Sequence, residues 1–254
     1  MDSSTALILN DATARFYRCN AESFSATRHA GWAGWEEALA RLEIEQAPRR
    51  IADIACGNMR FAAFAAQRWP GARVQLACVD ACAELAQHSL APAGVDLRFE
   101  QRDIVGMLVK GDSLMLPRSQ LAVCFGFMHH IPGAALRAEF AAQLLASLEP
   151  GGCAVLSLWQ FLQEEDLAAR ARLSTPRGMS CLGLKEGELE EGDCLLGWQG
   201  SEQCWRYCHS FTEGEARDLA AAALERAGLN AQTQTFEADG RNGRLNRYLL
   251  FKLR

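Results

Sequence analysis

The sequence predicts a single α/β domain in which a mostly parallel β-sheet carries helices on both faces. Two observations support this prediction. Short apolar runs, typical of buried strands, alternate with helical segments along most of the chain, and such alternation is typical of parallel sheets whose strands are joined by helices. The 254 residues also suffice for one large hydrophobic core.

The first half of the chain predicts successive strand–helix–strand units. An irregular opening that contains Trp32 and Trp35 comes first, and Pro70 with Gly71 ends the helix between the first two strands. The elements expected here are a helix at 36–43, a strand at 51–55, a helix at 59–68, a strand at 74–79, a helix near 84–90, a strand near 97–101 and a strand at 121–127.

The second half continues the alternation and then interrupts it. Leu136, Phe140, Leu144 and Leu148 recur every four residues, which predicts one face of a helix that ends at Pro150-Gly151-Gly152. The charged, glycine-containing stretch that follows the next strand is too long for a connection within a sheet, so it predicts a cap beside the active site. The remaining expected elements are a strand at 153–159, a helix at 213–227 and a closing hairpin with strands at 231–236 and 246–253.

These elements divide the single domain into four parts. They are an N-terminal substrate-side segment (1–48), a cofactor-binding core (49–159), a cap insertion (160–212) and a C-terminal helix with hairpin (213–254).

Composition excludes several classes of function. No apolar run approaches the roughly 20 residues that cross a bilayer, and residues 1–10 lack the pattern of an export signal. Cysteines such as Cys78 and Cys124 lie in apolar strands, which favours reduced thiols and a cytoplasmic location. We therefore expect no membrane contact.

The net charge of −5 gives no general attraction to nucleic acid, and we expect no DNA partner. Contact with RNA would depend on local arginine clusters, each of which is equally compatible with a solvated surface. The clusters are Arg15, Arg18 and Arg28; Arg170, Arg172 and Arg177; and Arg241, Arg244 and Arg247.

Candidate ligand-binding residues directly follow the predicted strands, because ligands of open α/β sheets bind beyond the carboxyl ends of the strands. The first strand leads into Asp53-Ile54-Ala55-Cys56-Gly57-Asn58-Met59, where small residues allow a ligand to approach the backbone. Asp80 ends the next strand, and its carboxylate suits the two hydroxyl groups of a ribose. Asp103 follows the third strand, where an acid is also a common helix cap.

Together these residues resemble the class I S-adenosylmethionine-dependent methyltransferases, over Arg49–Gly152 and the closing hairpin. The resemblance implies a Rossmann-like sheet of seven strands and S-adenosylmethionine as cofactor. Two glycines of the family's loop are replaced here, by Ala55 and Met59, and the Met59 side chain would crowd a cofactor if it pointed toward it. The residues expected to bind the cofactor are Asp53, Ala55, Gly57, Asn58, Asp80, Ala81, Asp103, Ile104 and Phe127.

A narrower resemblance is to the tRNA wobble-uridine carboxymethyl methyltransferases, which esterify a carboxymethyl group on the base. The matching segments are Phe24-Ser25-Ala26-Thr27-Arg28 with Trp32, Met128-His129-His130, Trp159, and the stretch 188–198 followed by Arg206-Tyr207-Cys208-His209-Ser210-Phe211. Cys208 replaces a tyrosine of the family, and Ala33 replaces a proline. The resemblance implies tRNA as substrate, and some members of the family work with a small activating subunit.

A carboxylate is already ionised at neutral pH, so its methylation requires positioning rather than a strong base. We expect Arg28 and Arg206 to orient the carboxylate or a phosphate, and His130 and His209 to form hydrogen bonds near the acceptor. Aromatic residues suit stacking against a base as well as packing of the cap. The residues expected to contact the substrate in this way are Trp32, Trp159 and Tyr207.

Two other functions stay open at this point. A methyltransferase for a small carboxylic acid or another metabolite would have a closed pocket without a basic rim. A binding protein that has lost catalysis would have Met59 in the cofactor site. We expect no metal, because Cys194, Cys204, Cys208 and His209 do not follow a standard zinc spacing. A dinucleotide-dependent dehydrogenase is disfavoured because the loop lacks the Gly-x-Gly-x-x-Gly pattern.

Overall fold

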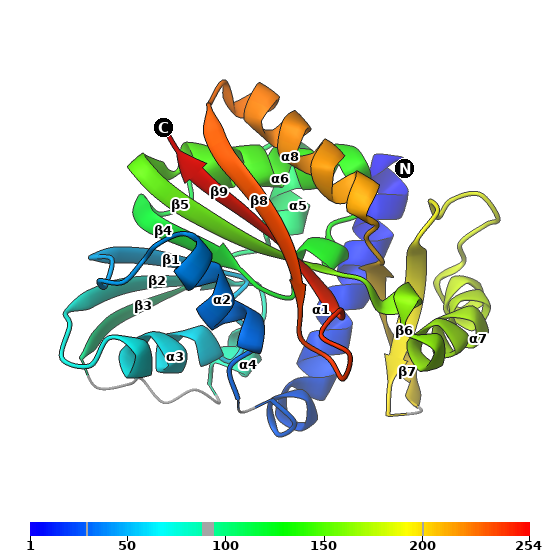
Figure 1. The fold of residues 1–254 in the computed structure, drawn as a ribbon. Coiled ribbons are helices and arrows are strands. Elements are labelled where there is room, and N and C mark those ends of the chain that lie inside the picture. The colour runs from blue at the N-terminus through cyan, green and yellow to red at the C-terminus, as the bar shows by residue number, and fades with distance from the viewer. Residues whose placement is uncertain (29, 88–93, 200) are drawn as a thin grey trace.

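The computed structural model describes residues 1–28, 30–87, 94–199 and 201–254. Its main sheet has seven strands in the order β3-β2-β1-β4-β5-β9-β8 (Figure 1). Neighbours from β3 to β5 are parallel, whereas β9 is antiparallel to both β5 and β8. The strands are β1 (Arg50–Ile54), β2 (Val74–Asp80), β3 (Val95–Gln101), β4 (Ser119–Cys124), β5 (Leu148–Trp159), β8 (Ala231–Ala238) and β9 (Asn246–Leu253). The predicted sheet and its closing hairpin are confirmed.

Helices cover both faces of this sheet. Alternate residues of β4 serve the two faces: Ala122 and Cys124 pack with α5, α6 and α8, whereas Leu121 and Val123 pack with α2 and α3. The helices are α1 (Ser3–Ser25), α2 (Ala33–Arg41), α3 (Arg60–Arg68), α4 (Ala83–Ala86), α5 (Ile104–Lys110), α6 (Ala134–Ala146) and α8 (Glu213–Ala227). No helix of the described residues is long and apolar enough to cross a membrane.

Helix α8 has the predicted bounds because its sequence carries both end signals. The Thr212 hydroxyl accepts a hydrogen bond from the Glu215 amide, and the Glu215 carboxylate accepts one from the Thr212 amide, which together form a capping box. Gly228 ends the helix with a φ of 63°, a left-handed conformation that favours glycine.

Two predictions about elements are wrong, and one helix was not predicted. The opening is not irregular: residues 3–25 form α1, whose buried face includes small or polar side chains such as Thr5, Asn10 and Thr13 that conceal its periodicity. Helix α5 was not predicted. Helix α6 ends at Ala146, and Leu148 instead begins β5 by pairing with Ser119 of β4. The helix expected near 84–90 is present as α4, and residues 88–90 lie outside the described residues.

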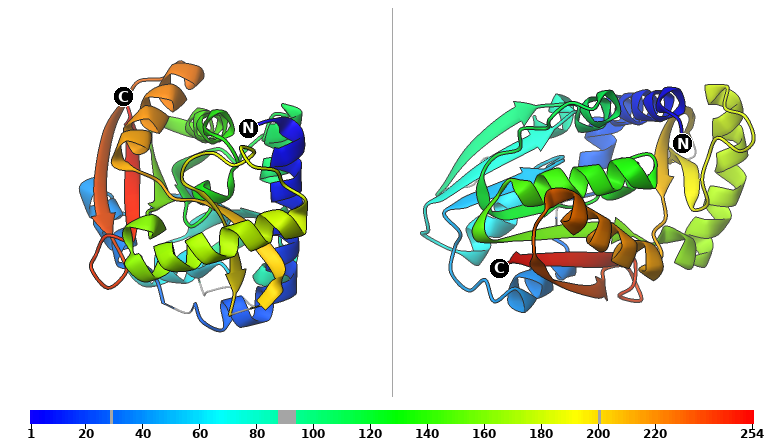
Figure 2. Two further views of the ribbon diagram at one scale, coloured as in Figure 1. Left: turned by 90° about the vertical axis from the view of Figure 1, so that its right-hand side faces the viewer. Right: turned by 90° about the horizontal axis from the view of Figure 1, so that it is seen from above.

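The cap insertion folds as a helix and a separate hairpin. Its elements are α7 (Glu165–Leu182), β6 (Asp193–Trp198) and β7 (Ser201–His209), and β6 pairs with β7 in an antiparallel two-stranded sheet. Viewed from the cap side, α7 crosses in front of the sheet and α1 runs along one side (Figure 2, left). Helix α1 packs against β7, where the Tyr207 amide donates a 3.0 Å hydrogen bond to the Thr13 hydroxyl. The N-terminal segment and the cap therefore form one wall of the molecule.

Candidate functional site

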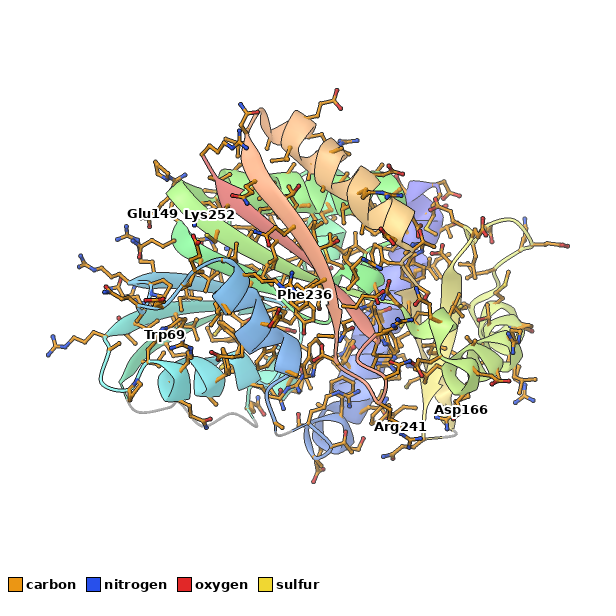
Figure 3. All side chains as sticks on the ribbon, viewed as in Figure 1. Trp69, Glu149, Asp166, Phe236, Arg241 and Lys252 are labelled. Carbon is orange, nitrogen blue, oxygen red and sulfur yellow. The ribbon has the colours of Figure 1, made fainter. Side chains whose placement is uncertain are left out.

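A cavity of about 1120 Å³ lies beyond the carboxyl ends of the parallel strands. The loop after β1 contributes Gly57, the end of β2 contributes Asp80, the loop after β4 contributes Phe127, and the end of β5 contributes Trp159. Helices α1 and α7 and strand β7 form the remaining walls. Glu149 and Lys252 mark the opposite end of the sheet, away from Asp166 on the cap and Arg241 in the β8–β9 turn (Figure 3).

The loop after β1 keeps a glycine-like backbone at positions without glycine. Ala55, Gly57 and Met59 have φ values of 58°, 53° and 56°, although a left-handed conformation costs a residue with a Cβ atom roughly 1–2 kcal/mol. A Cβ atom on Gly57 would meet no atom within 4 Å, so the space above this loop is open. The buried Met59 side chain packs in the core with Trp35 and Phe61 and does not line the cavity. It therefore does not crowd the expected cofactor.

Asp80 faces the cavity from the end of β2. Its Oδ2 accepts a 2.8 Å hydrogen bond from the Gly57 amide, and its Oδ1 accepts one of 2.8 Å from the Cys82 amide. Burial raises the pKa of this carboxyl above its ordinary value. Because a carboxylate has about four acceptor positions, Asp80 retains the capacity to accept two hydroxyl groups.

Asp53 lies in the core beneath the loop and does not line the cavity. Its side chain is 2% exposed, and its Oδ2 has no hydrogen-bond partner. Burial, and then the negative charge of Asp80, raise the pKa of Asp53 to about 7, with the Arg60 guanidinium opposing them. A buried acid without a partner is costly, so a positive charge bound above the loop would stabilise its ionised form.

The other expected cofactor residues line the cavity with different partners. Asp103 caps α5 by accepting from the Gly106 amide at 2.9 Å, and both of its oxygens also accept from Asn10 of α1 at 3.1 Å. The helix-cap role of this acid is thus confirmed. Asn58 donates from its amide nitrogen to the Arg28 carbonyl oxygen. Ala55, Ala81, Ile104 and Phe127 line the cavity as well.

Arg206 is a buried cation in the opposite wall of the cavity. It is 8% exposed, its Nε has no hydrogen-bond partner, and it forms no ion pair with any acid of the described residues. Its guanidinium lies 4.9 Å from the Phe16 ring centroid, 5.7 Å from that of Trp159 and 5.9 Å from that of Trp198. Aromatic faces stabilise a guanidinium only in part, so Arg206 retains a capacity to bind an anion.

Arg28 lines the same cavity beside this aromatic group. Its guanidinium lies 3.6 Å from the Phe24 ring centroid and 5.1 Å from that of Trp198. Burial lowers the pKa of Arg28 to about 10, so the side chain stays charged at neutral pH. Trp32 and Trp159, two of the residues expected to contact substrate, also line the cavity.

Of the two adjacent histidines, His130 is fully hydrogen-bonded and His129 is not. The Nδ1 of His130 donates to the Tyr207 carbonyl oxygen at 2.6 Å, so its Nε2 accepts from the Tyr17 hydroxyl at 2.7 Å. Burial, and then the charge of Arg206, lower the pKa of His130 to about 3. His129 lines the cavity with an unpartnered Nδ1, and burial lowers its pKa well below the ordinary value. The sequence predicted a functional role for His130; both histidines line the cavity, and His129 is the one with a ring nitrogen that lacks a partner.

Tyr207 and His209, which were expected at the substrate, lie outside the cavity lining. Tyr207 is fully buried and donates its hydroxyl to Asp193 at 2.6 Å. The two ring nitrogens of His209 lie 2.8 Å from Asp193 and 2.9 Å from Glu215. This is a correction: residues of a strand alternate between its two faces, so Arg206 faces the cavity while its neighbour Tyr207 and His209 face the core.

His129, His130 and Cys208 bring possible metal-ligating atoms within 4.8 Å of one another. A cation there would take one ring nitrogen of His130 and so replace one of its two hydrogen bonds. It would also approach Arg206, whose positive charge already lowers the pKa of both histidines. These residues do not fit a metal ion, and we assign none to them.

The chain matches no protein-family model and no curated protein. Its fold, however, resembles solved structures along nearly its whole length. An S-adenosylmethionine-dependent methyltransferase from Methanosarcina mazei is 17% identical, with 88% of this chain and 98% of that chain aligned and a TM-score of 0.58. DhpI, in complex with S-adenosylhomocysteine, is 12% identical, with 96% and 97% aligned and a TM-score of 0.62.

A third similar structure is magnesium protoporphyrin IX methyltransferase from Synechocystis with bound S-adenosylhomocysteine. It is 13% identical, with 94% of this chain and 84% of that chain aligned and a TM-score of 0.52. Identities of this size report the fold alone. The chain therefore has the Rossmann-like fold of S-adenosylmethionine-dependent methyltransferases.

Proposed function

We propose that this chain is an S-adenosylmethionine-dependent methyltransferase whose acceptor is a carboxylate, carried by a modified wobble uridine of tRNA. One observation supports this most strongly. A single cavity is lined both by Asp80, a buried acid at the end of β2 with Asp53 buried nearby, and by Arg206, a buried arginine that has no acid to pair with among the described residues. One end of the cavity suits a cationic nucleoside and the other suits an anion.

The cofactor end fits S-adenosylmethionine, which supplies an electrophilic methyl group on a positively charged sulfonium. Asp80 has acceptor positions for the ribose hydroxyls, and the open space above Gly57 admits the amino-acid part. The charge of Asp53 would favour the cofactor's positive groups from beneath the loop. The solved structures with S-adenosylhomocysteine support the same ligand for this fold.

At the acceptor end, the chain needs to hold an ionised carboxylate in line with the methyl group, within roughly 3–3.5 Å. The Arg206 guanidinium can donate from its unpartnered Nε to one oxygen and leave the other to attack, and it remains protonated, so it takes no proton from the nucleophile. His129 is neutral and lines the same cavity, so it can donate a hydrogen bond without adding a second charge. No general base is required for this reaction.

Two observations favour this reading over the alternatives. Exposed arginines, Arg18 and Arg170, line the cavity, whereas a small-acid methyltransferase was expected to lack a basic rim. The non-catalytic interpretation required Met59 in the cofactor site, but its side chain packs in the core.

The segments that resemble the wobble-uridine family supply Arg28, Trp32, Trp159 and Arg206 to one cavity. All ten cysteines are free thiols, in keeping with the cytoplasm, where we place the enzyme.

The first experiment is a calorimetric titration with S-adenosylmethionine and S-adenosylhomocysteine, for the wild type and Asp80→Ala. We expect micromolar binding that the variant loses. Methyl transfer is then measured on tRNA that carries carboxymethyl-uridine and on free small acids. Absence of cofactor binding to the folded wild type contradicts the proposal, and transfer only to small acids replaces its substrate.

Arg206→Met tests the acceptor end. A hydrogen-bonded charge contributes about 1.5–3 kcal/mol, so we expect kcat/KM for the carboxylate to fall by about 10-fold to 150-fold. Stability should stay equal or rise, because Arg206 has no acidic partner and replacing a buried charge with an apolar side chain is often neutral or favourable. Arg217→Met, on the exposed face of α8, is the matched control. Full activity in Arg206→Met would exclude this residue from the acceptor site.

A further inference from the structure

Among the described residues, the cavity lining has a charge opposite to that of the whole chain. Seven arginines and three aspartates line it, although the chain has a net charge of −5. The aspartates are Asp80, Asp103 and Asp239. One buried arginine, Arg206, suffices for the acceptor carboxylate, so the remaining positive charge requires a separate explanation.

Part of this charge lies at the mouth of the cavity. Arg18 on α1 and Arg170 and Arg177 on α7 line the cavity and are also exposed to solvent. Neither Arg18 nor Arg170 forms an ion pair or a side-chain hydrogen bond within the described part of the chain. Only some members of the arginine clusters predicted from the sequence therefore line the cavity. The members that do not line it are Arg15, Arg172 and the whole cluster Arg241, Arg244 and Arg247.

The cavity-facing stripe of α7 also carries an exposed apolar side chain. Arg170, Leu173 and Arg177 are spaced three and four residues apart, so they share one face of the helix. Leu173 is 69% exposed and lines the cavity. Arg170 and Arg177 stand two turns apart, about 10 Å along the helix axis, a spacing that suits successive anionic groups better than one small anion.

We infer that Arg18 of α1 and the Arg170–Leu173–Arg177 stripe of α7 form a clamp for the phosphates of an RNA strand at the mouth of the cavity. Arginine binds phosphate through two parallel hydrogen bonds, and Leu173 offers an apolar contact to a sugar or base between them. This inference rests on the proposed function for the chemistry inside the cavity. Binding of RNA at the mouth is nevertheless measurable without it.

The test uses the full chain and a fluorescent anticodon stem-loop RNA without the modified base, with fluorescence anisotropy at several salt concentrations and no cofactor. Arg18→Glu and Arg170→Glu should each weaken binding at least tenfold and reduce its salt dependence, because fewer phosphates are neutralised. Arg172→Glu has the same charge change on the same helix but does not line the cavity, so it should change the affinity less than twofold. Leu173→Ala should weaken binding without altering the salt dependence.

An equal effect of Arg172→Glu and Arg170→Glu would overturn the clamp, since general charge would then explain the binding. Absence of RNA binding by the wild type would overturn it as well. The two proposals fail separately. RNA binding without cofactor binding contradicts the methyltransferase activity and leaves the clamp standing, whereas methyl transfer to free acids without RNA binding contradicts the clamp and the tRNA acceptor and leaves the methyltransferase activity standing.

Discussion

The side-chain amide of Asn58 donates a 3.0 Å hydrogen bond to the main-chain oxygen of Arg28. Asn58 belongs to the loop after β1, and Arg28 follows the end of α1, so this bond joins the proposed cofactor end of the cavity to its proposed acceptor end. An occupied cofactor loop would thereby hold Arg28 in place for the acceptor.

Asn58→Ala should therefore affect the acceptor more than the cofactor. Loss of one such hydrogen bond costs about 1 kcal/mol, and we expect the KM for the acceptor to rise about fivefold. The Kd for S-adenosylhomocysteine, measured by calorimetry, should change less than twofold. The opposite pattern, a weaker cofactor with an unchanged acceptor KM, would assign Asn58 to direct cofactor contact.

Glycine substitutions at Ala55 and Met59 should distinguish the effect of backbone strain on stability from the effect of side-chain packing. Ala55→Gly removes left-handed strain of roughly 1–2 kcal/mol and adds unfolded-state entropy worth about 0.4–1 kcal/mol, so the free energy of unfolding should stay equal or rise slightly. Met59→Gly also relieves strain, but it deletes a buried side chain, which costs about 2–5 kcal/mol.

Met59→Gly should consequently be the less stable variant in urea unfolding. Its affinity for S-adenosylmethionine should not improve, because the Met59 side chain packs away from the cavity. A clear gain in affinity would show that this side chain does reach the cofactor.

The raised pKa of Asp53 predicts that both the stability of the protein and its affinity for the cofactor depend on pH. Its folded pKa of about 7 lies above the ordinary value of 3.8, so the folded state binds more protons between these values. Its contribution to stability is therefore greatest below pH 3.8 and is lost as pH rises through 7. Asp53→Asn should be more stable than the wild type at about pH 8, by on the order of 2–4 kcal/mol, and the difference should shrink toward pH 4.

A cationic ligand favours the ionised form of Asp53, so S-adenosylmethionine should bind more tightly as pH rises from about 6 to 8. S-adenosylhomocysteine lacks the sulfonium charge and should show a weaker trend. Calorimetry at three pH values measures both ligands, and Asp53→Asn should flatten the profile of S-adenosylmethionine. An unchanged profile in the variant would assign the titration to another group, with Asp80 the first to test.

His129 and His130 should differ in the consequences of their loss. His130→Ala leaves the buried Tyr17 hydroxyl and the Tyr207 carbonyl without their partner, which costs about 1–3 kcal/mol for each buried group. Its main effect should be a lower melting temperature.

His129→Ala removes no hydrogen bond within the described residues, so it should destabilise the protein less than His130→Ala, whereas kcat/KM for the acceptor should fall about tenfold. His129→Asn, which keeps a donor, should restore part of the activity. Equal melting temperatures and equal activities of the two alanine variants would contradict this division of roles.

The sequence predicted the fold well where local signals and burial agree. Thr212 and Gly228 fix the two ends of α8, and short apolar runs at 121–124 and 248–251 mark β4 and β9. Helix α1 escaped prediction because side chains such as Thr5, Asn10 and Thr13 are buried against neighbours that are distant in sequence. The spacing of Leu148 continued that of α6, yet strand pairing with Ser119 overrides it.

For the candidate site, too, residues placed by local signals could be predicted from the sequence, whereas residues placed by distant contacts could not. Positions at strand ends, such as Gly57 and Asp80, follow from the geometry of parallel sheets and were predicted to line the cavity. The cap residues depend on the orientation of β7, which no local signal fixes. Because successive side chains of a strand point to opposite faces, the sequence does show that Arg206 and Tyr207 cannot share one face of β7. The preference for His129 over His130 depends on Tyr17 and Tyr207, both far away in sequence.

The hydrogen bond between Thr13 and Tyr207 also has a consequence for protein synthesis. The two residues are 194 positions apart, so at about 5–20 residues per second the ribosome makes the partner of α1 roughly 10–40 s after α1 itself. During this interval Leu9 and Phe16, fully buried in the finished protein, lack the strand that covers them. Helix α1 is thus synthesised well before its partner strand, and its apolar face stays uncovered until the cap has been translated.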